Sequence, residues 1–306
     1  MRTFRTTLLP VVAGLLVLSS CNAASTGPVS LAGVGRIPGL HANAGTVIVD
    51  GVRAELAPSS GSKLGANAAG NRLLVIGDSI LAGTAGRYGG AMCAAMVPLG
   101  WRVAVEAEAG RPVAFGRSVL SNRLREGWDA AVVFLGTNYG GDKERYQDDL
   151  TRIVQSLAPR PVLLLTPTLF RDTMVQVTDA IRVVASVNPN VTVLDWGSVS
   201  TQQGLLNKDG IHPTDTGRRV LVASVAAAVG PAPKGAQSAS CLPSQYTDDS
   251  MGRDVMPTTV APGDTIAYDT VPVSTTVPAH TSSSVSSAPA TTVPANTTSV
   301  PTTVRQ

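Results

Sequence analysis

An apolar run of strand length that ends in a Gly-Asp-Ser turn constrains the fold more than any other stretch of the sequence. Residues 72–76 read Arg-Leu-Leu-Val-Ile, and Gly77, Asp78 and Ser79 follow directly. Gly77 permits a sharp turn, and Asp78 or Ser79 can cap a helix after it. A serine in such a turn stands clear of the sheet beside free backbone N–H groups, where a nucleophile can act. The turn alone favours Ser79 as a helix cap only, so a catalytic interpretation depends on the rest of the chain.

Strands and helices alternate from Asn71 onward. Short runs rich in Val and Leu, typical of strands buried on both faces of a parallel sheet, lie at residues 73–76, 102–106, 130–135, 162–166 and 191–194. Helices are predicted near residues 80–97, 116–125, 143–157, 173–187 and 215–229. This alternation predicts a three-layer α/β/α domain over residues 71–232, with a mainly parallel five-stranded sheet. Right-handed crossovers bring the carboxyl ends of the strands to one edge, where open α/β sheets bind ligands.

Polar residues and glycines follow these strands. Ser79 follows the first strand, Gly110 the second and Asn138 the third, while Asp209 and His212 come one segment after the fifth. A purely structural protein has no reason to concentrate such residues at one edge of its sheet. We therefore expect this edge to hold the functional site.

His212 is the only histidine inside the predicted domain, since His41 and His280 lie in the flanking segments. Asp209, three residues earlier, can accept a hydrogen bond from imidazole Nδ1–H and stabilise the imidazolium, leaving Nε2 to face a serine hydroxyl. A lone His-Pro before a helix is often only a turn, which is the alternative. Because the histidine comes with its carboxylate, the pattern predicts Ser79 as nucleophile, His212 as base and Asp209 as the orienting group.

Three hydrogen-bond donors could stabilise an oxyanion at this edge. They are the backbone N–H groups of Ser79 and Gly110 and the side-chain amide of Asn138, and the alternative is that Gly110 and Asn138 are ordinary turn residues. Glu106 and Glu108 fall on the same side of a strand end, and we interpret them as structural or rim residues. No His, Cys and Asp cluster has the spacing of metal ligands, so we expect no metal and no cofactor.

The ordered motifs resemble the SGNH, or GDSL-type, hydrolase family over about residues 71–230. The matching blocks are Gly77-Asp78-Ser79, Gly110, Gly136-Thr137-Asn138 and Asp209-Gly210-Ile211-His212-Pro213, in the family's order. Each block is short, and the ordered set at successive strand ends makes the resemblance specific. The resemblance implies a flavodoxin-like fold and the same triad and oxyanion hole that the residues predict.

A finer similarity points to the SGNH domains fused to membrane acyltransferases that O-acetylate cell-wall glycans. It lies in Val-Ile-Gly-Asp-Ser, Ala-Gly-Arg-Pro, Leu-Gly-Thr-Asn and Val-Leu-Asp-Trp. No multi-span acyltransferase module precedes the domain in this sequence, so we expect water to accept the acyl group. Arg111, Tyr139 and Trp196 are candidate substrate contacts, and the alternative for Trp196 is a packed residue at the sheet edge.

The N-terminus predicts an export signal over residues 1–20. Arg2 and Arg5 precede an apolar stretch at residues 8–18, and the Leu-Ser-Ser-Cys that ends at Cys21 resembles the bacterial lipobox. The resemblance implies lipidation of Cys21, which would anchor the exported protein at the outer face of the cell membrane. The alternative location is that the protein is secreted. Cleavage after Ala24 is the alternative.

The segments on either side of the domain resemble linkers. Residues 21–70 are rich in Ala, Gly, Ser and Asn, with one short hairpin pattern at residues 46–52. Residues 233–306 are predicted to be a linker and a disordered Thr-, Pro-, Val- and Ser-rich tail. In an exported protein Cys93 and Cys241 can pair, and two unpaired thiols are the alternative.

Charge and composition limit the partners of the chain. The net charge is +3 and no Lys/Arg cluster exceeds short pairs, so we expect no nucleic-acid binding. We expect a monomer that acts on an acylated saccharide or a small ester and contacts the membrane only through its lipid anchor. The expected activity is that of a serine esterase for short acyl groups, acetyl above all, on cell-envelope glycans. The alternatives are an O-acetyltransferase and a non-catalytic surface binding module.

Overall fold

The computed structural model describes residues 45–49 and 51–252 of the chain. The predicted signal peptide, Cys21 and the tail from residue 253 onward lie outside the described residues. Within the described ranges, no helix is both long enough and apolar enough to cross a membrane.

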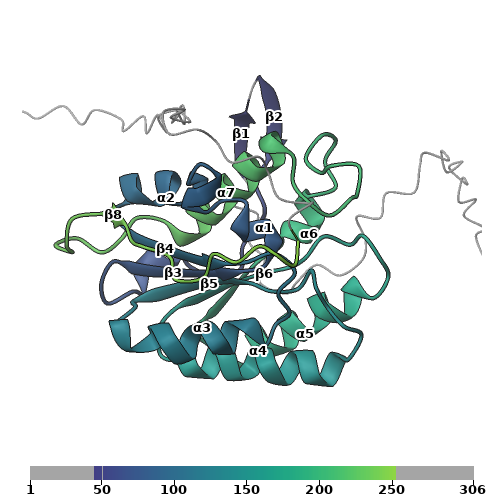
Figure 1. Ribbon diagram of the computed structural model, residues 1–306. Helices are drawn as coiled ribbons and strands as arrows, with labels where there is room; N and C mark the ends of the chain where they lie inside the picture. The colour runs from purple at the N-terminus through teal and green to yellow at the C-terminus, as the bar shows by residue number, and fades with distance from the viewer. Residues whose placement is uncertain (1–44, 50, 253–306) are drawn as a thin grey trace, which may run out of the picture. The chain divides into compact units, whose positions relative to one another are not determined.

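A parallel sheet with helices on both faces forms the body of the domain (Figure 1). In sheet order, its strands are β7 (Val191–Leu194), β6 (Val162–Leu165), β5 (Ala130–Phe134), β3 (Arg72–Gly77), β4 (Arg102–Ala107) and β8 (Ser240–Cys241). One face carries α1 (Ser79–Ala82), α2 (Ala91–Met96) and α7 (Asp215–Val229). The other carries α3 (Phe115–Arg123), α4 (Lys143–Leu157) and α5 (Met174–Val187). The predicted three-layer α/β/α fold is confirmed, and β3 to β7 have the flavodoxin-like strand order.

The sheet has six strands rather than the predicted five, because the chain returns to it after residue 232. β8 pairs in parallel with Arg102 and Val103 of β4. Leu242 N–H extends this contact by donating to the Val103 carbonyl at 2.7 Å. Residues 240–252 stay on the domain, so the folded part of the chain reaches Gly252 instead of ending at residue 232.

The segment before the sheet also belongs to the folded domain. β1 (Thr46–Val49) and β2 (Val52–Glu55) form the antiparallel hairpin that the sequence predicts. Beyond it, Ala57 N–H donates to Ser224 Oγ of α7 at 2.9 Å, and Leu64 is buried. Residues 56–70 are therefore packed against the domain rather than forming a free linker.

The helix predicted at residues 80–97 is broken into short pieces. α1 has only four residues, and α2 begins at Ala91. Between them Gly89 and Gly90 adopt φ angles of 93° and 70°, in the left-handed region that ends helices. The break places Arg87 and Tyr88 in a 3₁₀ turn outside any long helix. The other four predicted helices match the structure within two residues at each end.

Two of the three buried tryptophans, Trp101 and Trp128, keep a hydrogen bond to the backbone, whereas Trp196 Nε1 has no partner among the described residues. Trp101 Nε1–H donates to the Gly230 carbonyl at 2.8 Å, and Trp128 Nε1–H donates to the Arg123 carbonyl at 2.7 Å. Both indole rings are almost completely buried. Each ring therefore contributes its large apolar area to the core at little polar cost.

A disulfide joins Cys93 of α2 to Cys241 of β8, with the two Cα atoms 5.7 Å apart. The cross-link spans 148 residues of sequence and ties the last strand to the helix layer that covers β4. It is one of the contacts that hold the C-terminal segment on the domain.

Replacing Cys241 by serine should lower the free energy of unfolding by about 2–5 kcal/mol, because the cross-link restricts the unfolded chain over a long loop. Urea unfolding under oxidising conditions measures the change. Cys93→Ser is the matched variant and should lose a similar amount, and a reductant should then have no further effect on either variant. Equal stability of all three proteins would contradict this role of the disulfide.

Candidate active site

The ends of three neighbouring strands meet at the level of the Gly-Asp-Ser turn. Gly77 of β3 pairs in parallel register with Ala107 of β4 on one side and Phe134 of β5 on the other. The loops after β3, β4 and β5 therefore begin next to one another, and they carry Ser79, Gly110 and Asn138, the three predicted oxyanion residues. The strand order reverses here, between β3 and β5, which is where flavodoxin-like sheets bind ligands.

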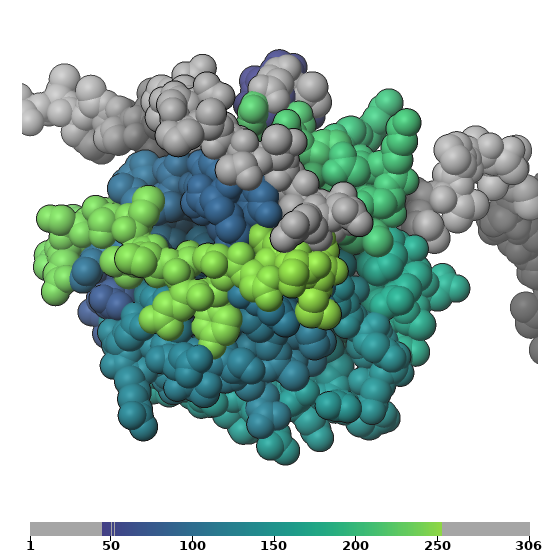
Figure 2. All heavy atoms as spheres, in the orientation of Figure 1, coloured from purple at the N-terminus to yellow at the C-terminus, as the bar shows by residue number. Residues whose placement is uncertain are grey.

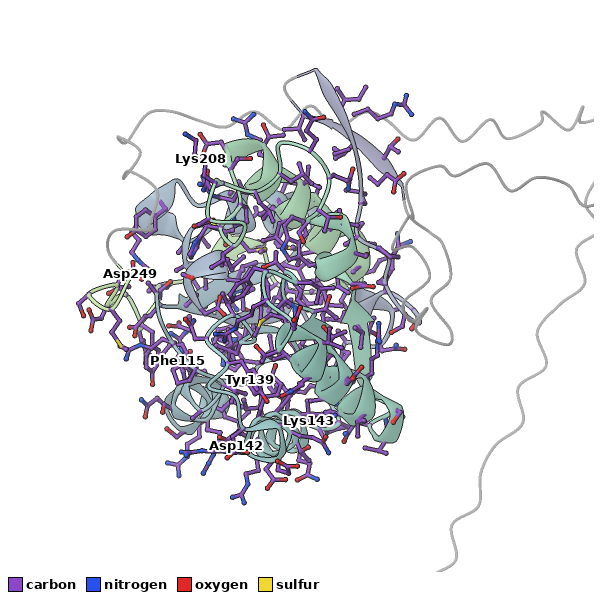
Figure 3. The ribbon with its side chains drawn as sticks, turned by 90° about the vertical axis from the view of Figure 1, so that its right-hand side faces the viewer. Phe115, Tyr139, Asp142, Lys143, Lys208 and Asp249 are labelled. Atoms are coloured by element: carbon purple, nitrogen blue, oxygen red, sulfur yellow. A yellow bond between two sulfur atoms is a disulfide. The ribbon has the colours of Figure 1, made fainter. Side chains whose placement is uncertain are left out.

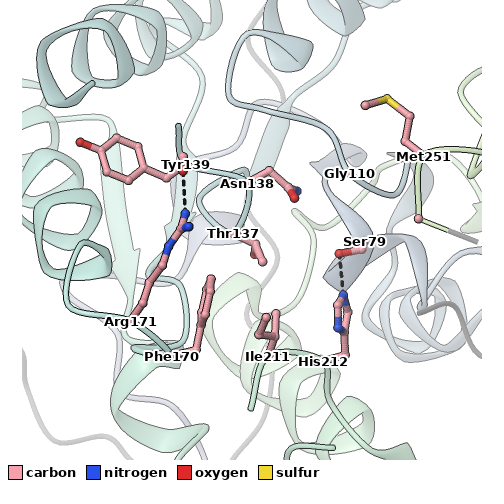
Figure 4. A pocket seen from close by; sticks show the side chains of 11 residues that line it. Ser79, Gly110, Thr137, Asn138, Tyr139, Phe170, Arg171, Ile211, His212 and Met251 are labelled. Atoms are coloured by element: carbon pink, nitrogen blue, oxygen red, sulfur yellow. Dashed lines mark hydrogen bonds between the residues drawn. The ribbon is translucent and has the colours of Figure 1, made fainter. Parts of the chain in front are cut away.

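Ser79, His212 and Asp209 form a chain of hydrogen bonds, of which Figure 4 shows the one between Ser79 and His212. Ser79 Oγ lies 2.9 Å from His212 Nε2, and His212 Nδ1 lies 2.7 Å from Asp209 Oδ2. With Nδ1 protonated toward the carboxylate, Nε2 is free to take the proton of the serine hydroxyl. The structure thus brings the three predicted triad residues into the arrangement that activates a serine nucleophile.

The turn that carries the imidazole is fixed by the same carboxylate. Asp209 Oδ1 accepts hydrogen bonds from the backbone N–H groups of Ile211 at 2.9 Å and His212 at 3.0 Å. Partial burial raises the pKa of Asp209, but the hydrogen bonds from Ile211 and His212 outweigh it and hold the pKa below its usual range. Asp209 is therefore ionised at neutral pH, which is the state that stabilises an imidazolium.

The first turn of helix α7 packs against the loop that precedes this turn. Thr214 caps the helix by accepting a hydrogen bond from Gly217 N–H at 3.0 Å. A Cβ at Gly217 would lie 1.8 Å from the Leu205 carbonyl oxygen, so only glycine lets the helix approach the preceding loop this closely. The first turn of α7 is thereby locked against the loop that leads to His212.

Asp78 lies beneath the nucleophile and is fully buried. Its carboxylate accepts hydrogen bonds from Ile80 N–H at 3.1 Å and from Thr137 N–H at 3.2 Å. Burial raises the pKa of Asp78 to about 6 in spite of these bonds. Asp78 caps α1 and ties the nucleophile turn to the loop after β5, while Asp209 is the carboxylate that contacts the imidazole.

Gly110 and Asn138 line the same pocket as Ser79 (Figure 4). Gly110 has a φ of 73°, and a Cβ there would lie 2.9 Å from Met251 Cβ, so both backbone and space require glycine. Asn138 Nδ2 donates to the Arg111 carbonyl at 3.2 Å, which orients the amide and leaves its second N–H for the pocket. The three predicted oxyanion donors thus share one pocket.

The pocket has a volume of about 500 Å³ and includes residues that the sequence did not single out. Phe170 and Arg171 form one side of it, with the guanidinium carbon 5.2 Å from the ring centroid. Arg171 also donates to the Tyr139 carbonyl at 2.6 Å. Both residues follow β6, so the strand-end rule that indicates the other site loops also indicates this one. Met251 and Gly252 close another side, and no sequence pattern predicts them.

The three predicted substrate contacts lie in different surroundings. Arg111 forms an ion pair with Glu108 at 2.6 Å and is not among the pocket residues. Tyr139 lines the pocket, but its hydroxyl donates to Gln176 at 2.7 Å and its ring points away from Ser79 (Figure 4). Trp196 in α6 (Trp196–Val199) is fully buried and does not line the pocket. It is therefore a packed residue, which is the alternative that the sequence left open. Within residues 45–49 and 51–252, no group of three or more His, Cys, Asp or Glu side chains could hold a metal ion.

No protein-family model and no curated protein matches the chain, but several solved structures resemble it. The C-terminal catalytic domain of peptidoglycan O-acetyltransferase A from Streptococcus pneumoniae is 22% identical, with a TM-score of 0.42 over 52% of this chain and 93% of that one. A G-D-S-L family protein from Desulfitobacterium hafniense is 16% identical, with a TM-score of 0.45 over 52% and 99%. A family 3 carbohydrate esterase from Clostridium thermocellum is 14% identical, with a TM-score of 0.44 over 52% and 94%.

The buried carboxyl of Asp78 should make the stability of the protein depend on pH. Its folded pKa of about 6 exceeds the unfolded value of 3.8, so the folded state holds the proton more tightly and loses stability as pH rises through this window. Asp78→Asn removes this titration. The stability of the wild type relative to the variant should therefore fall by about 2 kcal/mol between pH 4 and pH 7. Urea unfolding of both proteins across this range measures the difference, and a constant difference would contradict the raised pKa.

Proposed function

We propose that the protein is a serine esterase of the SGNH type that releases short acyl groups, acetyl above all, from cell-envelope glycans. The proposal rests above all on the hydrogen-bonded chain from Ser79 through His212 to Asp209, which ends in a pocket beside Gly110 and Asn138. A packing or capping role for Ser79 would not require a histidine and a carboxylate in line behind it.

Acylation begins at the Ser79 hydroxyl. His212 Nε2 takes the hydroxyl proton as Oγ attacks the ester carbonyl, and Asp209 stabilises the imidazolium that forms. Negative charge develops on the carbonyl oxygen, where the N–H donors of Ser79, Gly110 and Asn138 can receive it. His212 then gives its proton to the leaving alkoxide, which departs as the free hydroxyl of the glycan.

Water completes the cycle by the same route. His212 takes a proton from a water molecule, whose oxygen attacks the acyl group on Ser79. The second tetrahedral intermediate uses the same oxyanion donors. It collapses as His212 returns the proton to Ser79 Oγ, which releases the free carboxylic acid and restores the serine hydroxyl. No cofactor is needed for either half of the reaction.

The pocket lining supports a short acyl group on a saccharide. Phe170 and Ile211 are apolar, whereas Thr137, Asn138 and Arg171 place polar groups around the same space. A long acyl chain is bound best by a continuous apolar surface, whereas a sugar needs hydrogen-bonding groups next to apolar faces. The mixed lining therefore favours an acylated sugar.

We place the enzyme outside the cytoplasm, anchored through lipidated Cys21 at the outer face of the cell membrane or secreted. The Cys93–Cys241 disulfide supports this location, because such bonds persist in oxidising compartments. The triad and oxyanion residues all come from one chain, so a monomer holds the complete site, which supports action as a monomer.

Ser79→Ala should abolish the hydrolysis of chromogenic acyl esters, with kcat falling by roughly 10⁴- to 10⁶-fold, as expected when a catalytic serine is removed. Initial rates across acetyl, butyryl and octanoyl esters measure this and should be highest for acetyl in the wild type. Circular dichroism checks that the variant is folded. Undiminished turnover in folded Ser79→Ala would overturn the proposal and favour a non-catalytic surface module.

Water should be sufficient as the acyl acceptor. Acetate release from an O-acetylated glycan should proceed without any added sugar, and an added oligosaccharide should not accelerate it. Turnover that requires the oligosaccharide, with acetyl appearing on it, would instead identify an O-acetyltransferase with the same triad. His212→Ala serves as the blank in both assays because it leaves the nucleophile without its base.

A further inference from the structure

The C-terminal segment of the described chain, residues 240–252, lies along β4 and ends at the active site; we name it the strap. Figure 2 shows it as a yellow-green band across one face of the domain. Glu106 accepts hydrogen bonds from the backbone N–H groups of Gln245 and Tyr246 at 2.8 Å and 2.9 Å. Glu108 accepts one from Asp248 N–H at 2.9 Å. The two buried carboxylates thus guide the strap to the carboxyl end of β4.

Near its end the strap forms a partly buried ion pair with Arg87 at the loop that carries Gly110. Asp249 accepts hydrogen bonds from Arg87 at 2.7 Å and 2.9 Å and from the Tyr88 hydroxyl at 2.9 Å. It also accepts one from Ala109 N–H at 2.9 Å. Its side chain is only 9% exposed, and it lies on the same side of the domain as Phe115 (Figure 3).

The same ion pair holds both ends of a three-residue turn. Arg87 donates to the Ala107 carbonyl at 2.7 Å, while Asp249 holds Ala109 N–H. Gly110 follows immediately, and Met251 packs against it from the strap side, where a Cβ on Gly110 would lie 2.9 Å from Met251 Cβ. The peptide that carries the Gly110 N–H is therefore held on one side by the hydrogen bond from Ala109 N–H to Asp249, and on the other by the contact with Met251.

We propose that Asp249 is a positioning residue of the oxyanion hole, which fixes the Ala107–Gly110 loop so that Gly110 N–H points at the oxygen of the transition state. This inference rests on the proposed esterase function. Oxyanion donors act only when they are already in place, and an error of about 1 Å in a reacting group can cost roughly a hundredfold in rate.

A purely structural role accounts less well for Asp249. The Cys93–Cys241 disulfide and the Tyr246 ring, packed edge-on against Phe115 with centroids 5.2 Å apart, already hold the strap on the domain. A buried ion pair adds little net stability, because desolvation offsets most of its attraction. Burial acts to raise the pKa of Asp249, but the hydrogen bonds from Arg87 and Ala109 N–H hold it below its usual range. The carboxylate is therefore charged at every pH at which the esterase would be assayed.

The test compares Asp249→Ala with Tyr246→Phe in the full chain. Tyr246 lies on the same strap, and its hydroxyl donates to the Ser118 carbonyl at 2.9 Å, away from Gly110. With p-nitrophenyl acetate, Asp249→Ala should lower kcat by on the order of tenfold to a hundredfold with KM little changed. Asp249→Asn should recover part of this loss, because its amide oxygen can still accept from Ala109 N–H. Tyr246→Phe should lower the melting temperature and leave kcat unchanged.

Amide hydrogen exchange supplies a readout that does not depend on activity. Exchange in the Ala107–Gly110 loop should accelerate in Asp249→Ala and not in Tyr246→Phe. The inference is overturned if Asp249→Ala leaves both kcat and this exchange unchanged, or if kcat falls only in step with melting temperature in both variants. A wild type that hydrolyses no ester would instead overturn the proposed function, and exchange alone would then decide whether Asp249 holds the loop.

Discussion

The parallel register of β3 between β4 and β5 is the constraint on which the whole site depends. It sets Gly77 level with Ala107 and Phe134, so that three loops start from one short stretch of the sheet edge. Asp78, directly after this point, accepts hydrogen bonds from Ile80 N–H in the nucleophile turn and from Thr137 N–H in the loop after β5. A shift of one residue in either strand pairing would separate the nucleophile from its oxyanion donors, because every side chain would move to the opposite face.

Much of the fold and the triad could be predicted because their signals are local. Buried parallel strands leave apolar runs, α4 shows the full amphipathic period, and Asp209 stands three residues from the histidine that it orients. The broken helix after Ser79 was predictable in principle from the paired glycines at positions 89 and 90. The burial of Trp196 was not, since no local pattern says which side of a strand end a short helix will cover.

The strap could not be predicted from the sequence because nothing in it is periodic. Its backbone is held by side chains far away along the chain, as in the bonds from Gln245 and Tyr246 to Glu106, which cross 139 and 140 residues. Glu106 and Glu108 were predicted to be structural or rim residues, and their carboxylates are in fact the acceptors for this segment. A carboxylate that is buried at a strand end, with no metal ligands beside it, thus indicates that backbone N–H groups from a distant segment donate hydrogen bonds to it.

The sequence distance between Ser79 and His212 determines when the site can form as the chain folds. Ser79 and His212 are 133 residues apart in sequence. Ser79 begins α1 just after β3, and His212 lies just before α7. Neither half of the domain holds both residues, so a chain still emerging from a ribosome cannot yet form the Ser79–His212 hydrogen bond. Because contacts this distant form only when a small domain folds cooperatively, turnover by the proposed esterase would report that the entire sheet is assembled.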